Sequence, residues 1–330
     1  MLVSFNYRVG ALGFLDLSSF STAERVFETN CGLRDQVAAL EWVRENIASF
    51  GGDPDEVTVF GESSGAGSIT TLMTCPSADG LFHRAIAQSP PATSVYGSER
   101  AATVAKQFLD ILDVEPARID TLLRLPYRTV IEASDTLVNE VPTKIPGTLA
   151  MAPVVDRDFL PRYPVAAFQK GYSHRIPLII GSNKDESSIF KFMKSPLLPV
   201  TSDSVQEMLR AIATDHPELP AARLADILSA TRTAANRRAH SRCPATPRSG
   251  CPPCGWPMPT AALADVDVPV RPGHPDAQGR AHRSRARHRT PVRLRQFRHP
   301  QHRPTFWLGG RKTALEVSGR IQRRWLAFAR

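Results

Sequence analysis

The stretch TVFGESSGAGS, residues 58–68, decides the fold of this chain. The β-branched and aromatic residues of Val57–Phe60 predict a short strand, and Ser64–Met73 predicts a helix that follows after a sharp bend. Between them, residues 61–65 fit the pattern G-x-S-x-G with Ser63 at its centre. In that pattern the central serine lies on a strained turn with its side chain exposed. The spacing therefore predicts Ser63 as a nucleophile, and the alternative is a glycine-rich turn without chemistry.

Two glycines flank this serine, at positions 61 and 65. A side chain two residues to either side would collide with the neighbouring strand and helix, so we expect both Gly61 and Gly65 to be required. Ser64 fits the nucleophile position less well, because Glu62 and Ala66 stand at its corresponding offsets. Its backbone N–H, at the start of the predicted helix, is instead expected to be an oxyanion donor.

The first 235 residues alternate between strand and helix patterns. Alternation of this kind predicts an α/β protein with a mainly parallel sheet flanked by helices. The further strands predicted are Leu2–Tyr7, Arg84–Gln88 and Ile176–Gly181, and the further helices are Arg34–Phe50, Glu99–Leu112, Ala117–Leu123, Gln206–Ala213, Ala221–Ala230 and Thr313–Phe328.

Three stretches carry a family resemblance: VSFNYRVGALGFL, GLRDQVAALEWVRENIASFGGDPDEVTVFGESSGAGS and GLFHRAIAQS. Together they resemble the type-B carboxylesterase family of α/β-hydrolases, over about residues 2–235 and again 304–330. The resemblance implies the α/β-hydrolase fold and a serine carboxylesterase that hydrolyses uncharged small-molecule esters through an acyl-enzyme. It implies no cofactor.

The order of a triad in this fold is serine, then acid, then histidine. The loop IPLIIGSNKDESSIF, residues 176–190, resembles the acid-bearing loop of the family and implies Glu186 as the acid, with Asp185 as the lesser candidate. Without the resemblance, a catalytic acid and an ordinary helix start formed by Asn183, Asp185 and Glu186 are equally good interpretations of this loop. Glu62 resembles a glutamate that shapes the site electrostatically and is not a triad member.

No histidine after the acid stands in a context that resembles the family. His288 is the weak candidate for the base, and the identity of the base stays open. The other histidines considered are His282, His299 and His302 in the same region, His174 and His216, which lie in no motif, and His83, whose context indicates a structural role.

Residues 237–304 differ in composition from the rest of the chain. They contain 14 Arg, 3 Asp and no Lys, together with 12 Pro and 6 His. Their local charge is +11 in a chain of net charge +9, so the remainder carries −2. One interpretation is a disordered basic insert that binds a polyanion. The interpretation we favour is translation out of frame, with a compensating shift near Pro304, and nucleic acid is then not an expected partner.

This composition divides the chain into three expected parts. Residues 1–236 form a partial hydrolase core, residues 237–304 are disordered, and residues 305–330 supply a C-terminal helix. His240, Cys243, Cys251 and Cys254 have the residue types of a zinc site, but their spacing is not typical of one, and we expect no metal.

Relatives in the family have on the order of a hundred residues ahead of the position of Met1, including an HGGG-type oxyanion loop. No HGG occurs in this sequence. The resemblance therefore implies an α/β-hydrolase fold lacking the N-terminal strands, with an open sheet edge. We expect impaired hydrolysis, and the alternative is a catalytically inactive module that acts by binding or through its basic segment.

The remaining composition is that of an ordinary globular protein, with 42% hydrophobic and 22% charged residues. No apolar run is long enough to cross a membrane, and the first residues do not form a signal-peptide pattern. Five cysteines, a low and odd number, indicate a reducing compartment. These features predict a cytoplasmic protein without a membrane partner, and they leave the oligomeric state open.

Overall fold

The computed structural model describes residues 1–91, 93–144, 148–183, 210, 266–267 and 311–329. Within these residues, a five-stranded sheet lies at the centre, with the strands in the order β1-β5-β2-β3-β4. The strands are β1 (Leu2–Val3), β5 (Val266–Asp267), β2 (Thr58–Glu62), β3 (Arg84–Gln88) and β4 (Leu178–Gly181). β2, β3 and β4 run parallel, whereas β5 runs antiparallel to both of its neighbours.

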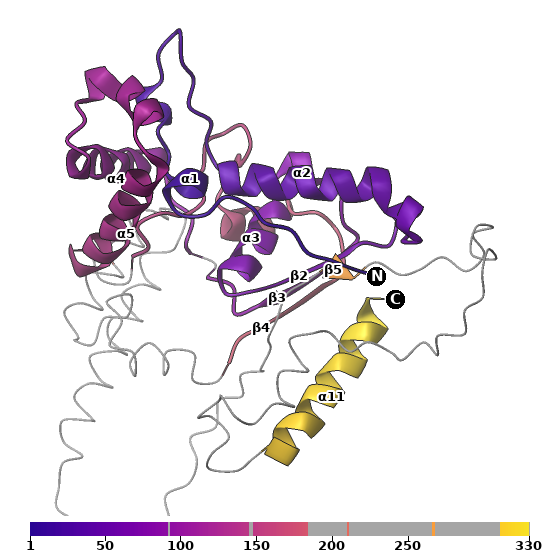
Figure 1. Cartoon of the computed structure of the whole chain (residues 1–330). Helices are drawn as coiled ribbons and strands as arrows, with labels where there is room; N and C mark the ends of the chain where they lie inside the picture. The colour runs from indigo at the N-terminus through magenta and orange to yellow at the C-terminus, as the bar shows by residue number, and fades with distance from the viewer. Residues whose placement is uncertain (92, 145–147, 184–209, 211–265, 268–310, 330) are drawn as a thin grey trace, which may run out of the picture.

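Helices cover the two faces of this sheet (Figure 1). Helix α2 (Cys31–Asn46) and helix α3 (Ser64–Leu72) lie on one face, and helix α11 (Arg311–Phe328) lies on the other. Leu33 and Leu40 of α2 are buried in one hydrophobic cluster with Val59 of β2. On the opposite face, the rings of Phe60 and Trp325 meet edge to face at 5.7 Å.

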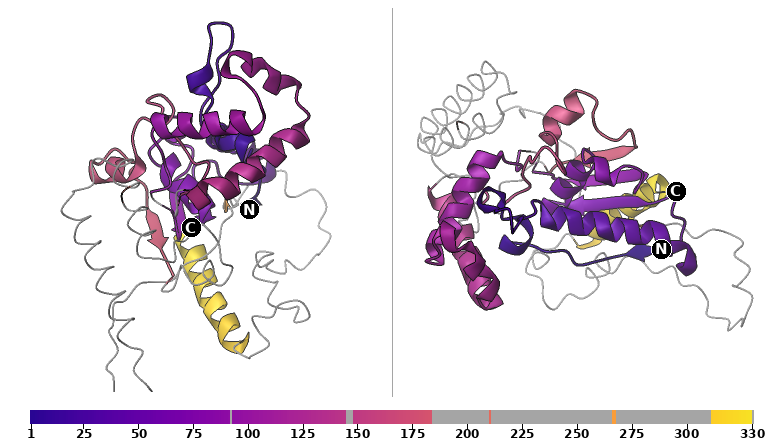
Figure 2. Two further views of the ribbon diagram at one scale, coloured as in Figure 1. Left: turned by 90° about the vertical axis from the view of Figure 1, so that its left-hand side faces the viewer. Right: turned by 90° about the horizontal axis from the view of Figure 1, so that it is seen from above.

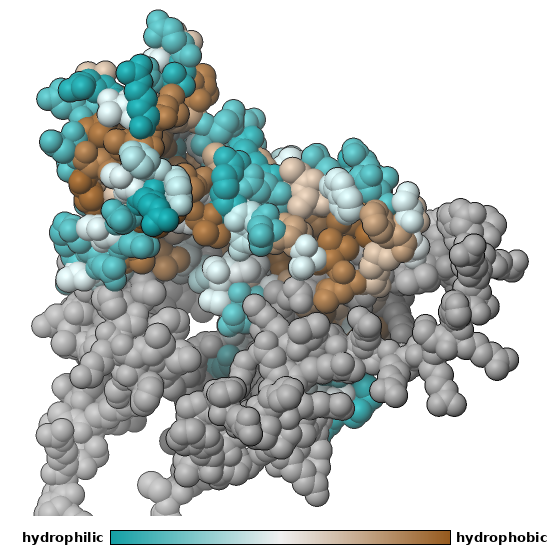
Figure 3. All heavy atoms as spheres, viewed as in Figure 1, coloured by the Kyte–Doolittle hydropathy of each residue, from teal (hydrophilic) through white to brown (hydrophobic). Residues whose placement is uncertain are grey.

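A second hydrophobic cluster lies beyond one end of the sheet, where α4 (Ser98–Ile111) and α5 (Tyr127–Lys144) pack beside α1 (Ala11–Phe14) (Figure 2). Phe108 of α4 and Leu137 of α5 are buried in it. The outer face of α5 reaches the surface, with Tyr127 64%, Ile131 43% and Val138 45% exposed. Figure 3 shows apolar side chains at the surface in this region.

Shorter helices complete the described chain: η1 (Ser18–Phe20), η2 (Ile47–Phe50), η3 (Pro76–Ala78), η4 (Pro116–Arg124) and α6 (Pro164–Gln169). Within the described residues, no helix has both the length and the apolar character needed to span a membrane.

Most of the elements expected from the sequence are confirmed, with three differences. The strand expected over Leu2–Tyr7 is only Leu2–Val3, because its described neighbour β5 has only two residues to pair with it. The segment Ala117–Leu123 forms a 3-10 helix instead of an α-helix. Helix α5 was not predicted, although Val130, Leu137 and Val141 follow a helical spacing. The expected helices Gln206–Ala213 and Ala221–Ala230 and the segment 237–304 lie essentially outside the described residues.

The two described cysteines have different environments, and this leads to a first prediction. Burial raises the pKa of the Cys75 thiol to about 12, with a smaller contribution from Asp156, while Arg34 opposes the rise. Because the thiolate is the nucleophile, Cys75 is expected to resist iodoacetamide at pH 8, whereas the partly exposed Cys31 reacts. Peptide mapping by mass spectrometry checks this. Alkylation of Cys75 at the rate of Cys31 in folded protein would contradict it, and both should react in urea.

Candidate active site

Ser63 joins β2 to α3 in a strained backbone conformation. Its φ is 54° and its ψ is −120°, in a region that non-glycine residues seldom occupy. Two hydrogen bonds hold this geometry: the Ser63 N–H donates to Gln88 O at 2.8 Å, and the Gly67 N–H donates to Ser63 O at 2.9 Å. The side chain of Ser63 is exposed. The chain thus turns from strand to helix within one residue and presents the serine hydroxyl outward.

The two glycines around Ser63 differ in the space that a side chain would have. A Cβ placed on Gly61 would lie 2.4 Å from the carbonyl carbon of Gly65 and 2.7 Å from Ala66 N, so the return of the helix over the strand requires Gly61. A Cβ on Gly65 would meet nothing within 4 Å in the described part of the chain. The collision expected at Gly65 is therefore not observed among the described residues. Strand β2 and helix α3 approach closely at one contact, between Gly61 and the backbone of Gly65 and Ala66. The absence of a side chain at position 61 is enough to permit this contact.

The backbone N–H of Ser64 opens helix α3. The first N–H groups of a helix have no partner within the helix, and no described residue accepts a hydrogen bond from this one. The positive end of the helix dipole lies at the same place. A negative oxygen next to Ser63 would therefore be stabilised here, as expected for an oxyanion donor.

Both histidines among the described residues, His83 and His174, form contacts at a distance from Ser63. His83 Nδ1 accepts the Val57 N–H at 3.2 Å, ahead of the start of β2 and thus at the end of the strand opposite to Ser63. His174 Nε2 lies 3.0 Å from Cys75 O, and its ring lies beside Phe82. Neither can serve Ser63 as a base, and the structural role expected for His83 is confirmed.

The remaining predicted site residues Asp185, Glu186 and His288 lie outside the described residues, as do His240, Cys243, Cys251 and Cys254. Strand β4 nevertheless leads toward the position of the acid loop. β4 is parallel to β3, and Gly181 O at its carboxyl end accepts the Ser89 N–H at 2.7 Å. The chain therefore leaves β4 at the same edge of the sheet at which Ser63 lies, five residues before Glu186.

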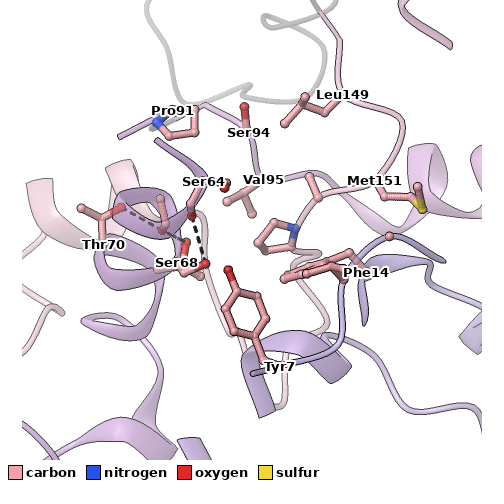
Figure 4. A pocket seen from close by; sticks show the side chains of 16 residues that line it. Tyr7, Phe14, Ser64, Ser68, Thr70, Pro91, Ser94, Val95, Leu149 and Met151 are labelled. Carbon is pink, nitrogen blue, oxygen red and sulfur yellow. Dashed lines mark hydrogen bonds between the residues drawn. The ribbon is translucent and has the colours of Figure 1, made fainter. Parts of the chain in front are cut away.

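A cavity of about 220 Å³ adjoins the first turns of α3 (Figure 4). Ser64 and Ser68 line one wall, and the hydroxyl of Tyr7 points toward them from the opposite side. Most of the other lining side chains are apolar: Val9, Phe14, Pro91, Val95, Leu149, Met151, Ala152 and Pro153. The sequence analysis did not find this cavity, because its walls come from four segments that are distant in the chain.

A hydrogen-bonded anchor holds the wall that carries Leu149 and Met151. Asn30 adopts φ 53° ahead of α2, and its side chain exchanges two 2.8 Å hydrogen bonds with the backbone of Val154. Asp156 accepts hydrogen bonds from the Thr29 hydroxyl, the Asn30 amide and the Leu160 N–H. Burial opposes ionisation of Asp156, but these hydrogen bonds together outweigh it and lower its pKa.

We expect Asp156→Asn to destabilise the protein by about 2 kcal/mol at pH 7, because an amide has one accepting oxygen in place of two and cannot keep the bonds from Thr29, Asn30 and Leu160 together. The folded-state pKa of Asp156 is below 3.8, so this stabilisation is complete above that pH and is lost as the pH falls through the lowered pKa. Urea unfolding at pH 7 and in acid checks both statements. Asp158→Asn is the control, because that side chain is 91% exposed. An equal effect of the two substitutions would contradict the prediction.

The comparisons with known proteins agree with this geometry. Residues 1–242 match the family model described as the carboxylesterase family, which is well over half of the chain. The chain belongs to the carboxylesterase family. Among curated carboxylesterase relatives, it is 43% identical over 190 residues to the para-nitrobenzyl esterase of Bacillus subtilis, covering 58% of this chain and 38% of that protein. It is 35% identical to the bile salt-activated lipase of Mus musculus, covering 63% and 34%.

Solved carboxylesterase structures share the fold. A carboxylesterase of Geobacillus stearothermophilus superimposes with a TM-score of 0.56 at 33% identity, covering 73% of this chain and 46% of that one. A thermophilic pNB esterase gives 0.54 at 37% identity, covering 62% and 41%. The expected α/β-hydrolase fold and the family resemblance are confirmed. The chain spans less than half the length of these carboxylesterases.

Proposed function

We propose that this chain is a serine hydrolase of uncharged carboxylic esters. Ser63 attacks the ester carbonyl, the alcohol leaves, and water then releases the acid from the acyl-enzyme. One observation carries the proposal: Ser63 has φ 54° between β2 and α3, with its side chain exposed beside the Ser64 N–H, for which no described residue is an acceptor. A strained serine at this junction is the arrangement that activates a nucleophile in this fold.

Each step assigns a role to a residue of the chain. The Ser63 proton passes to a histidine, which returns it to the leaving alcohol, and the Ser64 N–H stabilises the oxyanion. Glu186 is the proposed acid that orients the histidine. The base lies outside the described residues, and His288 is the candidate for it. The family of the chain and the printed names of its relatives support an ester as the substrate.

The cavity beside Ser64 supports a small apolar group on that ester. Its volume of about 220 Å³ exceeds the engineered cavity of about 150 Å³ that holds benzene in another protein. The hydroxyls of Tyr7 and Ser94 can bind a polar atom at its wall. We therefore propose esters with a short or ring-sized group as substrates.

We propose further that turnover is slow. No described side chain is hydrogen-bonded to Ser63 Oγ, and only one oxyanion donor, the Ser64 N–H, is identified among the described residues. Loss of one oxyanion donor slows related chemistry by about 10²–10³. We expect hydrolysis of 4-nitrophenyl acetate at least 10²-fold below that of the Bacillus subtilis para-nitrobenzyl esterase assayed in parallel. A comparable rate would contradict slow turnover but not the reaction itself.

Reaction with a fluorophosphonate probe tests the assignment of the nucleophile. We expect a stoichiometric adduct on the peptide that contains residues 58–68, with fragment ions placing the phosphonyl group on Ser63. Protein unfolded in urea before addition of the probe is the control and should not react. An adduct on another residue, or none in protein shown by circular dichroism to be folded, would overturn the proposal.

A further inference from the structure

A second cavity, of about 430 Å³, lies beside Asp156 and shares no lining residue with the cavity beside Ser64. Its walls come from residues 16–34, from residues 155–158 and from Ser98 at the start of α4. Four carboxylates line it, and we call it the acidic cavity. All of its lining residues belong to the described part of the chain, so their charges and partners can be followed one by one.

One wall of the acidic cavity carries a buried carboxylate with an oxygen for which no described residue is a partner. Asp16, two residues after the end of α1, is only 6% exposed. Its Oδ1 accepts the Ser18 N–H at 2.8 Å, whereas no described residue donates a hydrogen bond to Oδ2 or forms an ion pair with it. Burying a charge is costly unless the charge is paired and hydrogen-bonded. Asp16 therefore points to a cationic hydrogen-bond donor in the cavity.

The two arginines that line the acidic cavity do not supply this donor. Arg34 is held by other groups, because its Nε donates to Thr29 O at 2.8 Å and its Nη2 lies 3.1 Å from Glu28 Oε2. Arg157 forms no ion pair with any carboxylate of the described residues. Four carboxylates therefore face two guanidinium groups, and the lining keeps two negative charges in excess.

Asp156 is a second carboxylate of the cavity whose charge no arginine neutralises. Its hydrogen bonds come from neutral groups: the Thr29 hydroxyl, the Asn30 amide and two backbone N–H groups. These bonds favour the ionised form, in agreement with the lowered pKa of Asp156, but they leave its negative charge in place. A cation in the cavity is therefore attracted by both Asp16 and Asp156.

The lining of the acidic cavity favours an organic cation over a metal ion. Among the described residues, no three His, Cys, Asp or Glu side chains form a group that could hold a metal ion. The volume of the cavity is well above the engineered volume of about 150 Å³ that holds benzene in another protein. Val26, Phe27 and Val155 add apolar surface, against which an alkyl chain can pack. A primary ammonium group has three N–H donors, which suit the Oδ2 of Asp16.

We propose that the acidic cavity binds a small primary alkylammonium ion. The ammonium group donates a hydrogen bond to Asp16 Oδ2, and the alkyl chain packs against Val26 and Phe27. Glu28 and Asp158 contribute less, because Arg34 lies 3.1 Å from the first carboxylate and 3.8 Å from the second. Binding at this site does not depend on hydrolysis by Ser63.

The first test compares three probes of similar chemistry on the full chain at one fixed salt concentration: n-butylammonium, tetramethylammonium and 1-butanol. Nuclear magnetic resonance of the amides gives both the affinity and the place of binding. We expect n-butylammonium to shift the Ser18 amide saturably, because this N–H donates to Asp16. Tetramethylammonium has the charge but no N–H donor, and 1-butanol has no charge, so both should bind at least about 10-fold more weakly. Equal affinity of the two cations would indicate attraction by charge alone and would overturn the proposal.

The second test removes one charge at a time. Asp16→Asn keeps the Oδ1 that accepts the Ser18 N–H but loses the charge, and we expect the affinity for n-butylammonium to fall at least about 10-fold. Glu24→Gln is the matched control, because it removes an exposed carboxylate that does not line the cavity, and its affinity should not change. Equal losses in the two variants, both shown by circular dichroism to be folded, would contradict the site. Binding seen only in Arg157→Gln would show that Arg157 itself neutralises Asp16, and would likewise overturn the proposal.

Discussion

Ser63→Ala is expected to reduce 4-nitrophenyl acetate hydrolysis to the rate of the buffer, because no other hydroxyl occupies the junction of β2 and α3 in this geometry. In serine hydrolases the loss of the nucleophile alone costs about 10⁶ in kcat, so even a slow enzyme should fall to background. The readout is the initial rate with excess substrate, corrected for the uncatalysed reaction. Active-site titration of the same samples gives the fraction of protein that reacts.

Ser64→Ala is the matched control for this substitution. It removes the adjacent hydroxyl but keeps the backbone N–H that we assign to the oxyanion. We expect the rate to stay within a few-fold of the unmodified chain. Hydrolysis that persists in Ser63→Ala, or that disappears equally in both variants, would contradict the assignment of Ser63.

Gly61→Ala is expected to destabilise the fold by about 3 kcal/mol, at the upper end of what overpacking usually costs. The new methyl group would lie 2.4 Å from the backbone of Gly65, and neither β2 nor the start of α3 can move without breaking the turn at Ser63. We expect the urea midpoint to fall, and any residual reaction with the fluorophosphonate probe to slow as well.

Gly65→Ala tests whether the close approach of β2 and α3 requires a glycine at position 61 only or at both positions. Its Cβ meets nothing within 4 Å among the described residues, and alanine is the better helix former by up to about 1 kcal/mol. Unchanged or slightly higher stability is therefore expected. If Gly65→Ala were as damaging as Gly61→Ala, the geometry of the junction would have to be different from the one described.

The local elements near Ser63 could be predicted because their causes are local. Val57–Phe60 has the β-branched and aromatic residues of a strand, and the glycine-serine pattern that follows permits only a sharp turn into a helix. The strand Arg84–Gln88 is observed with the bounds expected from its apolar run. Helix α5 has an equally clear spacing, but the proline at position 142 within it weakens the pattern.

The sequence by itself determined the family, the junction at Ser63 and a mainly parallel sheet, since strand, turn and helix preferences act between residues close in the chain. Only the tertiary structure decided that Gly61, and not Gly65, makes the close approach. It also decided that Tyr7 and Met151 line one cavity beside Ser64, and that β5 lies between β1 and β2. The physical reason is that these contacts join segments far apart in the chain. Which residues meet in these contacts depends on how the whole sheet and its helices pack together. No local pattern of residues specifies that packing.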